Sequence, residues 1–425
     1  MFFKFYQTIW VVGFIGLIFL PGTAQAKAVL LPGLVEEARQ QNPQIQAAHA
    51  KWKAAQRKIT RVSWLEDPEL SYSYFGDSIE TRVGPQEHAF GVSQKLPVPQ
   101  KLHYRAEVAR QEAKATRQMY EAVVLDITTQ VKEIYYELYW IQKAIEIAEQ
   151  DKVLLEHFEQ VARAHFTAHG GRQQDVSKAQ VEVSQVIDRL LVLKQQATSV
   201  EARFDDLLNR QEETQWGRLP DFEIPNLTQA RDDLLLLAEE NQQALTAAEH
   251  RFKGRKAQVK LAQYRYLPDV TAGIKYINVG NGTTSTADDG KDAWMVTLGI
   301  NLPIWEHALR ANVQEAKAHA DSAASELNSV RNQTEYWVTD AYVRWQTAKN
   351  LVDLYDVAVI PQARQALDAA ESAYRAGEGD FLNLLDSERV WLNAQLTYWR
   401  AFSDAAKSAA ILERAVGKTL TETTT

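Results

Sequence analysis

His165 and His169 have the spacing best suited to chemistry in this sequence. Side chains four residues apart share one face of a helix, and two imidazoles placed in this way can ligate a metal ion. No Asp, Glu or Cys beside them completes a ligand set, so we expect a solvated pair. The sequence also lacks HExxH and GxSxG, and Gly377-Glu378-Gly379 has neither the strand nor the third glycine of a nucleotide site. These patterns predict no catalytic residues, no cofactor and no metal site.

Two groups of glycines stand between helical stretches: Gly170 with Gly171, and Gly377 with Gly379. A tight reversal between antiparallel helices needs residues that accept a positive φ, so turn geometry alone explains much of their presence. Small residues at such a tip also let another helical hairpin approach it end to end. We therefore expect two helical tips, near residues 167–175 and 376–383.

The elements that carry these tips occur twice in the chain. At a shift of 200 residues Pro68 aligns with Pro268, and the shift drifts to 208 at the tips, where Gly171 aligns with Gly379. Loop insertions in a duplicated gene would produce such a drift, so we predict an internal two-fold repeat. The predicted units are residues 27–211 and 229–418, with a linker at 212–228.

Each unit is predicted to run helix, two strands, very long helix, turn, helix. The first helices cover about 33–66 and 229–266, and each ends at a proline. From Leu102 to Ala148, apolar or small residues recur in steps of three and four, which is the coiled-coil repeat. A helix over about 101–166 would be about 100 Å long. Pro361 should interrupt the long helix of the second unit.

The hydrophobic period changes from helical to alternating after Pro68 and Pro268. This change predicts four strands of about ten residues, a length that crosses a bilayer when tilted. The strands form hairpins within 68–97 and 268–303, with exposed loops at 76–85 and 278–292. A pair of soluble hairpins packed on a helix is the alternative.

Four strands leave two hydrogen-bonding edges, which lipid cannot satisfy. The chain must then associate; three copies give twelve strands, and dimers stay arithmetically open. Three copies also place six similar helical hairpins around one axis. The predicted fold class is mainly α with a small β part: coiled-coil helices form a trimeric α-barrel that a 12-stranded transmembrane β-barrel continues.

Residues 1–26 have the pattern of a signal peptide, with Lys4, an apolar run from Ile9 to Leu20, and a small-residue cleavage site ending at Ala26. No other stretch has the length and apolarity of a transmembrane helix. The chain has 47 Lys and Arg against 55 Asp and Glu, which argues against nucleic acid as a partner. It has no cysteine, which excludes disulfides and an N-terminal lipidated cysteine. Residues 419–425 are expected to be a disordered tail.

The sequence resembles the TolC-like outer-membrane efflux proteins over essentially the whole chain after the leader. The resemblance lies in both helical tips and in three segments: Leu34 to Asn42-Pro43, Asp67-Pro68-Glu69-Leu70, and Ser93 to Lys101. It implies a homotrimer in the outer membrane of a Gram-negative bacterium, in contact with lipid and extending into the periplasm. It also implies docking to a periplasmic adaptor (membrane fusion) protein and an inner-membrane pump of the RND type, with the adaptor at Gly170, Gly171, Gly377 and Gly379.

The resemblance further implies an aperture at the periplasmic end. Asn383 and Asp386 match the constriction, with Asp380 beside them, and Tyr374 and Asp175 match a hydrogen-bonded latch. Three copies of Asp386 around a narrow axis would form a cation-favouring acidic ring, whereas a solvated acidic turn near a helix start is the alternative. The sequence departs from some relatives by Gly379 in place of a latch arginine and by Asn383 in place of an acid.

The predicted function is a passive duct from the periplasm to the exterior. The Ser93 to Lys101 stretch resembles members paired with metal-cation pumps, which favours heavy-metal cations as substrate. Drugs or secreted polypeptides are the alternatives. A periplasmic coiled-coil scaffold or chaperone without a pore is the competing function from another class.

Overall fold

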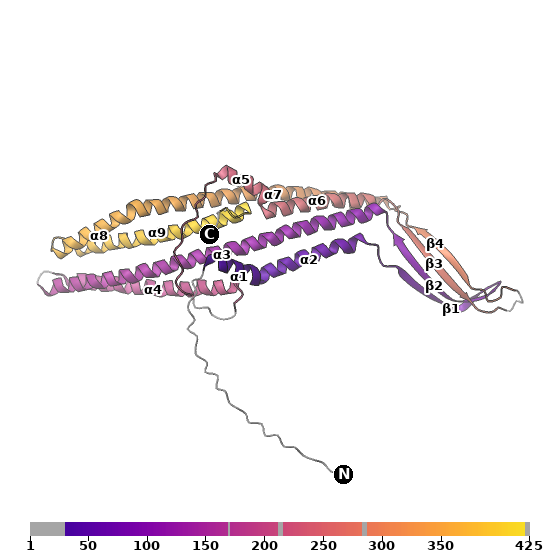
Figure 1. Cartoon of the computed structure of the whole chain (residues 1–425), viewed down its shortest axis with the longest axis horizontal. Helices are drawn as coiled ribbons and strands as arrows, with labels where there is room; N and C mark the ends of the chain where they lie inside the picture. Colours follow the sequence, from indigo (N-terminus) through magenta and orange to yellow (C-terminus); the bar gives the residue numbers. More distant parts are fainter. Residues whose placement is uncertain (1–29, 169–170, 211–215, 283–286, 421–425) are drawn as a thin grey trace, which may run out of the picture.

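A computed structural model describes residues 30–168, 171–210, 216–282 and 287–420. The predicted signal peptide and most of the predicted tail lie outside these residues. The molecule is elongated: helices form one long body, and a sheet stands at one end of it (Figure 1). None of the helices in the described ranges is both long and apolar enough to span a membrane.

The first half of the chain contains α1 (Leu31–Gln41), α2 (Pro43–Ser63), α3 (Pro99–Thr167) and α4 (Gln173–Leu207). The second half contains α5 (Arg231–Asn241), α6 (Gln243–Tyr264), α7 (Glu306–Leu354), the π-helical η1 (Tyr355–Val359), α8 (Ile360–Arg375) and α9 (Phe381–Val416). Proline stands in the first turn of α1, α2 and α3, where its missing N–H leaves no helical hydrogen bond unmade. The predicted mainly helical fold with a small sheet is confirmed.

The prediction of one helix over 33–66 is wrong, because the chain bends at Asn42 between α1 and α2. The Asn42 side-chain oxygen accepts a hydrogen bond from the Gln44 backbone N–H at 2.9 Å, which caps α2. Its amide nitrogen donates to the Leu207 carbonyl at the end of α4, at 3.0 Å. One buried side chain therefore begins one helix and satisfies the end of another.

The helix predicted over 229–266 is divided in the same manner at Gln242, between α5 and α6. The Gln242 side-chain oxygen accepts from the Ala244 N–H at 3.2 Å. Its amide nitrogen donates to the carbonyls of Arg414 and Ala415, near the end of α9, at 3.1 and 2.9 Å. The helical hydrophobic period continues through both bends, so periodicity could not reveal them.

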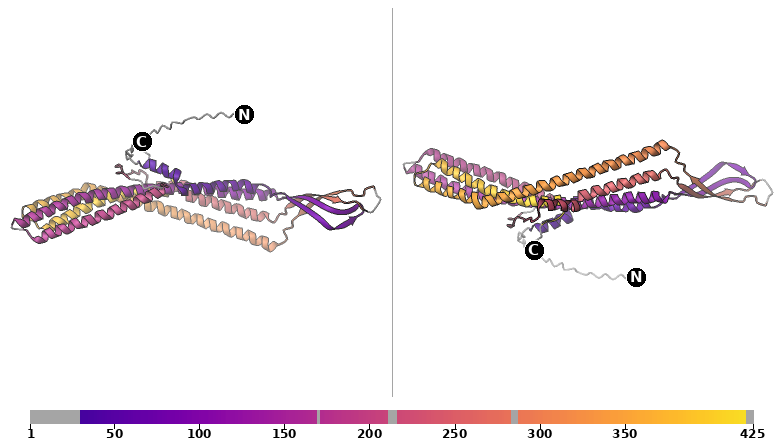
Figure 2. Two further views of the ribbon diagram at one scale, coloured as in Figure 1. Left: turned by 90° about the horizontal axis from the view of Figure 1, so that it is seen from below. Right: turned by 90° about the horizontal axis from the view of Figure 1, so that it is seen from above.

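Each helix contacts only its neighbours across most of the body. Beside the sheet the order of packed helices is α2, α3, α6, α7, and toward the tips it is α4, α3, α9, α8. The views from below and above show a body that is far thinner than it is long (Figure 2). The helices therefore form a layer, and the core is distributed along its length.

The predicted coiled-coil pattern of α3 is confirmed by burial. Near the sheet the buried positions are alanines, and toward the middle of α3 they are larger: Ala106, Ala109, Ala113, Ile127, Val131, Ile134, Leu138, Ile141 and Ala148. The alanines let α6 approach closely, since a Cβ on Gly254 of α6 would lie 3.3 Å from the Gln111 Cβ on α3. Residue size along the seam thus sets the spacing between helices.

The predicted interruption at Pro361 takes the form of a widened turn. The helix continues through η1, and the Ile360 N–H bonds to the Tyr355 carbonyl, five residues earlier. A proline inside an α-helix removes one N–H and clashes with the carbonyl four residues before it. A π-helical turn ahead of Pro361 relieves that conflict without ending the helix.

The sheet is antiparallel and has the order β1 (Glu69–Thr81), β2 (Gly84–Leu96), β3 (Val270–Val279), β4 (Ala293–Ile300). The loop predicted at 76–85 is wrong for the most part, because β1 continues to Thr81 past an irregularity after Tyr74. Gly84, at φ 121°, begins β2 directly after the turn. The second predicted loop holds for 280–282 and 287–292; residues 283–286 lie outside the described ranges.

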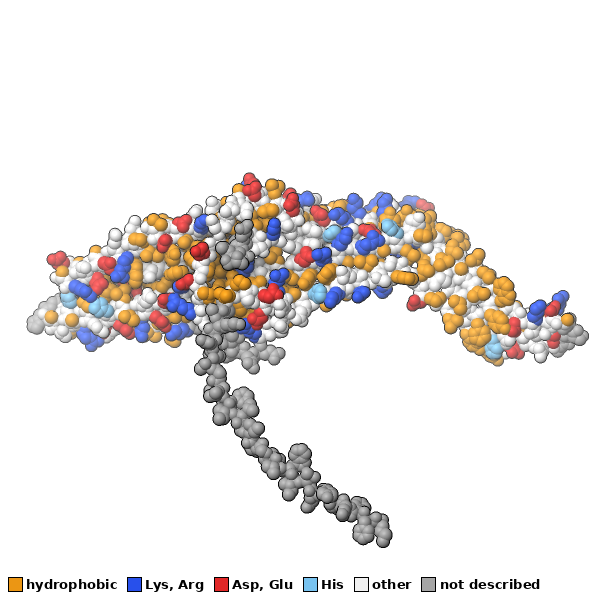
Figure 3. All heavy atoms as spheres, viewed as in Figure 1, with side chains coloured by type: hydrophobic (Ala, Val, Ile, Leu, Met, Phe, Trp, Pro, Cys, Tyr) orange, Lys and Arg blue, Asp and Glu red, His pale blue; other side chains and the backbone are white. Residues whose placement is uncertain are grey.

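The two faces of the sheet differ in chemistry. Register places large apolar side chains on one face, each at least 46% exposed, in two rows across the four strands: Leu70, Val92, Ile274, Val296, and Tyr72, Phe90, Tyr276, Trp294. The other face carries mostly small or polar residues, among them Ser71, Gly91, Lys275, Ser93, Gly273 and Thr297. Figure 3 shows hydrophobic side chains covering the visible face of the sheet. So large an exposed apolar surface is typical of a membrane or protein contact.

A buried ion pair fastens the sheet to the helices. The Lys101 ammonium group, in the first turn of α3, donates to the Asp269 carboxylate at 2.6 Å and to the Leu267 carbonyl at 2.7 Å. Asp269 stands directly before β3, and its own carbonyl accepts from the Asn301 N–H just after β4, at 3.2 Å. One lysine therefore holds the point where the second hairpin leaves the helical body.

Candidate functional site

The first helical tip joins α3 to α4. Gly170 and His169 lie outside the described residues. The Gly171 N–H donates to the His165 carbonyl at 3.0 Å, and a Cβ on Gly171 would lie 2.5 Å from the Phe166 nitrogen. The positive φ expected for Gly171 is wrong: the residue is glycine because the chain passes too close to the end of α3 for any side chain.

The second tip, between α8 and α9, repeats this closure. The Gly379 N–H donates to the Ala373 carbonyl at 3.0 Å, and a Cβ on Gly379 would lie 2.9 Å from the Tyr374 nitrogen. Gly379 is thus required by close approach, again without a positive φ. Gly377 does have the predicted positive φ, 75°, and the space around its Cα is open. The second tip therefore combines a left-handed turn with a tight closure.

Tyr374 connects the two tips. It is 6% exposed, and its ring stacks on His165 of the first tip at 5.1 Å between centroids. On its other side it contacts Phe381, the first residue of α9, also at 5.1 Å. Burial, with the charges of Asp175 and Asp380, raises the pKa of Tyr374 to about 12, so the phenol is neutral. Within the described residues no hydrogen bond joins Tyr374 to Asp175, and the latch stays a prediction.

The acidic and amide residues predicted at the aperture fall into two groups. Asp175, in the first turn of α4, lies near Asp380, which precedes α9; burial and then the Asp380 charge raise the pKa of Asp175. Asn383 and Asp386 are exposed on the first two turns of α9. The structure thus brings Asp175 and Asp380 together across the tips, and leaves Asn383 and Asp386 facing outward from the protomer.

Three buried carboxyl groups escaped the sequence reasoning. Asp151 on α3 and Glu388 on α9 are each 1% exposed, and Glu182 on α4 is 8% exposed. A signal existed in the sequence: the apolar seam of α3 reaches Ala148 and resumes at Leu155, and Asp151 occupies the seam position between them. A charged residue at such a position is a departure that requires an explanation.

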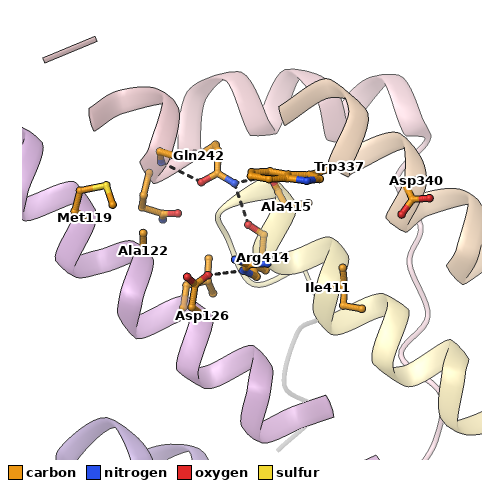
Figure 4. A pocket seen from close by; sticks show the side chains of 12 residues that line it. Met119, Ala122, Asp126, Gln242, Trp337, Asp340, Ile411, Arg414 and Ala415 are labelled. Carbon is orange, nitrogen blue, oxygen red and sulfur yellow. Dashed lines mark hydrogen bonds and ion pairs between the residues drawn. The ribbon is translucent and has the colours of Figure 1, made fainter. Parts of the chain in front are cut away.

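A pocket of about 200 Å³ lies beside the α5–α6 bend, lined by Met119, Trp337 and Ile411 among others (Figure 4). Two of its polar side chains are occupied by internal bonds: Asp126 pairs with Arg414, and the Gln242 amide bonds to backbone carbonyls. Across the described ranges, no three His, Cys, Asp or Glu side chains are grouped so that they could hold a metal ion.

The fold and part of the sequence are shared with known proteins. A family model described as "Outer membrane efflux protein" matches residues 34–210 and 234–418. The cobalt-zinc-cadmium resistance protein CzcC of Cupriavidus metallidurans is 21% identical over 387 residues, covering 89% of this chain and 87% of CzcC.

Solved structures agree with the fold. The outer membrane protein VceC from Vibrio cholerae superposes with a TM-score of 0.76 at 22% identity, covering 91% of this chain and 96% of VceC. The open state of the MtrE outer membrane channel of Neisseria gonorrhoeae gives a TM-score of 0.75 at 20% identity, covering 92% and 89%. Because the family model spans most of the sequence, the chain belongs to the outer membrane efflux protein family.

Proposed function

We propose that the chain is the outer-membrane duct of a tripartite efflux system and works as a homotrimer without catalysis. The observation that carries this proposal is the four-stranded sheet, which has free edges at β1 and β4 and exposes one apolar face. Unpaired strand edges cannot lie in lipid, so the sheet needs further strands beside it. Pairing β4 of one copy with β1 of the next satisfies both edges, and three copies give a barrel of twelve strands.

The two faces of the sheet suit the two sides of such a barrel. The apolar face would contact lipid, and its row of Tyr72, Phe90, Tyr276 and Trp294 has the composition of an aromatic girdle at a bilayer interface. The face with Ser71, Gly91 and Lys275 would line a wet interior. Small and polar inward residues leave room for water and solute.

The helical layer supports the same reading. A thin layer of helices that contact only their neighbours has two long free edges, α2 or α4 on one side and α7 or α8 on the other. Three such layers would close into a hollow tube that continues the barrel into the periplasm. The internal two-fold repeat would give this tube six similar hairpins.

The tips are the proposed contact with the rest of the system. Gly171, Gly377 and Gly379 keep them narrow, which would let the helical hairpins of a periplasmic adaptor approach end to end. The adaptor would link the duct to an inner-membrane pump of the RND type. Asp175, Tyr374, Asp380, Asn383 and Asp386 would form the aperture at this end.

Heavy-metal cations are the proposed substrate class. The proposal is supported by the similarity to CzcC, whose name describes cobalt, zinc and cadmium resistance. Deletion of the gene should increase sensitivity to these cations and leave sensitivity to hydrophobic drugs unchanged. Increased sensitivity to drugs alone would reassign the substrate and retain the duct.

The duct itself is tested by location and conductance. The protein should fractionate with the outer membrane, migrate in a heat-modifiable manner on a gel, and form ion-conducting trimers in a planar bilayer. A soluble periplasmic pool with no conductance would favour the competing function of a coiled-coil scaffold.

A further inference from the structure

Three carboxyl groups occupy seam positions of three different helices in the tip half of the molecule. Each stands where its helix otherwise buries apolar or small residues, three or four positions away on either side: Ala148-Asp151-Leu155 on α3, Ala179-Glu182-Val186 on α4, and Leu385-Glu388-Leu392 on α9. α3 packs against both α4 and α9, and the charge of Glu182 acts on both Asp151 and Glu388, so the three acids form one cluster. The cluster spans the contact between the α3–α4 hairpin and the α8–α9 hairpin.

Two arginines face these acids, and the arginines compensate the negative charges of the three acids to different extents. Arg389 of α9 pairs with Glu182, with its Nε 3.4 Å from a carboxylate oxygen. Arg189 of α4 contributes a favourable charge to Asp151. Asp151 and Glu388 form a side-chain hydrogen bond with each other, and within the described residues neither Asp151 oxygen accepts a bond from any other donor. The charge of Glu182 is therefore compensated, and Asp151 and Glu388 remain enclosed together.

Two buried carboxyl groups beside one another cannot both be ionised at low cost. Transfer of a charge from water into an apolar seam costs several kcal/mol, and a second like charge nearby adds to it. Burial and the neighbouring Asp151 raise the pKa of Glu388 to about 9, and burial also raises the pKa of Asp151. Near neutral pH the pair therefore retains a proton while the seam is closed.

We propose that Asp151 and Glu388, with Glu182 beside them, are positioning residues for the aperture at the tips. Together they form a lock, a proton-holding contact between the two helical hairpins. The proposal rests on the proposed duct, whose aperture at the tips must widen for a solute to pass. When the hairpins separate, water reaches the acids, they ionise, and the proton passes to solvent. Opening then releases protons, so by linkage acid favours the closed seam and alkali favours the open one.

The lock predicts a pH-dependent distance between α3 and α9. The chain contains no cysteine, so Val153→Cys on α3 and Val390→Cys on α9, both exposed positions, can carry spin labels. In detergent-solubilised protein the label separation should be longer and more broadly distributed at pH 9.5 than at pH 6. An unchanged distribution over this range overturns the proposal.

Glu388→Gln supplies the decisive variant, because glutamine copies the protonated acid and cannot ionise. The label distribution should stay at its pH 6 form throughout, whereas the exposed control Glu378→Gln should respond as the unaltered protein does. Asp151→Asn serves the same purpose if Glu388→Gln fails to assemble. If the distance between the labels still increases with pH in these variants, other groups are responsible for the titration and the proposed lock is wrong.

Conductance measurements distinguish failure of the proposed lock from failure of the proposed duct. If trimers conduct and the distances ignore pH, the duct stands and the lock fails. If the distances respond to pH and no conductance is found, the lock stands and the duct fails.

Discussion

Asn42 and Gln242, 200 residues apart in the chain, occupy equivalent bends and make equivalent bonds. Each accepts a hydrogen bond from the first turn of the helix that follows it, and each donates to carbonyls near the end of the last helix in its half. Those ends are matched as well, since Asn209 and Gly417 follow them in left-handed conformations, at φ 54° and 84°. The bends therefore fix the short helices α1 and α5 to the middle of the body.

Removing either side chain should destabilise the helical body. Asn42→Ala and Gln242→Ala each lose a helix cap and leave buried carbonyls unsatisfied, at a cost of about 1–3 kcal/mol. Thermal unfolding of the purified protein, followed by circular dichroism, measures the effect. Gln56→Ala, at an exposed position on α2, is the matched control and should change little.

Loss of Lys101 should weaken the junction of sheet and helices. Lys101→Met leaves the buried Asp269 without its partner charge, which costs about 3–5 kcal/mol. Adding Asp269→Asn should recover part of this loss, because the uncompensated charge is then gone. The yield of folded trimer in the outer membrane measures both variants; a double variant no better than Lys101→Met would contradict the assigned role of the ion pair.

Bulk at the second tip should block export without preventing assembly. Gly377 has open space around it, so Gly377→Trp introduces no internal clash, and its positive φ costs about 1 kcal/mol. Gly377→Asn, which tolerates the left-handed conformation, is the control. We expect trimers from both and metal resistance only from the asparagine variant. Resistance retained by Gly377→Trp would count against docking at this tip.

Asp380 and Asp386 should contribute to ion selectivity. If they ring a narrow aperture, the double substitution Asp380→Asn with Asp386→Asn should reduce the preference for cations over anions. Reversal potentials of trimers in a planar bilayer under a salt gradient measure this preference. Glu378→Gln, on the same turn, should have a smaller effect, and an unaltered selectivity in the double variant would disprove the acidic ring.

Stability should fall as the pH rises, because of Glu388. Its pKa in the folded protein, about 9, lies above the ordinary value of 4.5, so the folded state holds more protons between these values. The contribution of Glu388 to stability is therefore greatest below pH 4.5 and declines toward pH 9. The melting temperature of Glu388→Gln should decline less over this interval. An equal decline in both proteins would show that other groups dominate.

Most of the fold could be predicted from the hydrophobic periodicity of long stretches of the sequence. The seam that starts at Leu102 and resumes at Leu155 predicts one helix over about 101–166, which is about 100 Å at roughly 1.5 Å per residue. Alternation after Pro68 and Pro268 located the strands in the same way. The bends at Asn42 and Gln242 were missed because the buried apolar positions continue at helical spacing on both sides of each residue: Leu34, Ala38 and Ile45 around Asn42, and Leu234, Ala238 and Leu245 around Gln242.

The site was less accessible to sequence reasoning because it depends on contacts between distant segments. The stacking of Tyr374 on His165 joins residues from different halves, and no local pattern reports it. The glycines were found, but for Gly171 and Gly379 the cause was close packing of the backbone and not a positive φ. Asp151 was visible as a gap in the seam, whereas its neighbours Glu182 and Glu388 required the packing of three helices.

The free edges of β1 and β4 have a genetic consequence. If the barrel closes only through the strand edges of neighbouring copies, one defective edge prevents closure of the barrel even when the other two chains are intact. A chain that folds its helices and joins a trimer, yet cannot pair β4, would therefore inactivate the mixed trimers that it forms with wild-type chains. Mutations in these strands should behave as dominant, and mutations that prevent the chain from joining a trimer should behave as recessive.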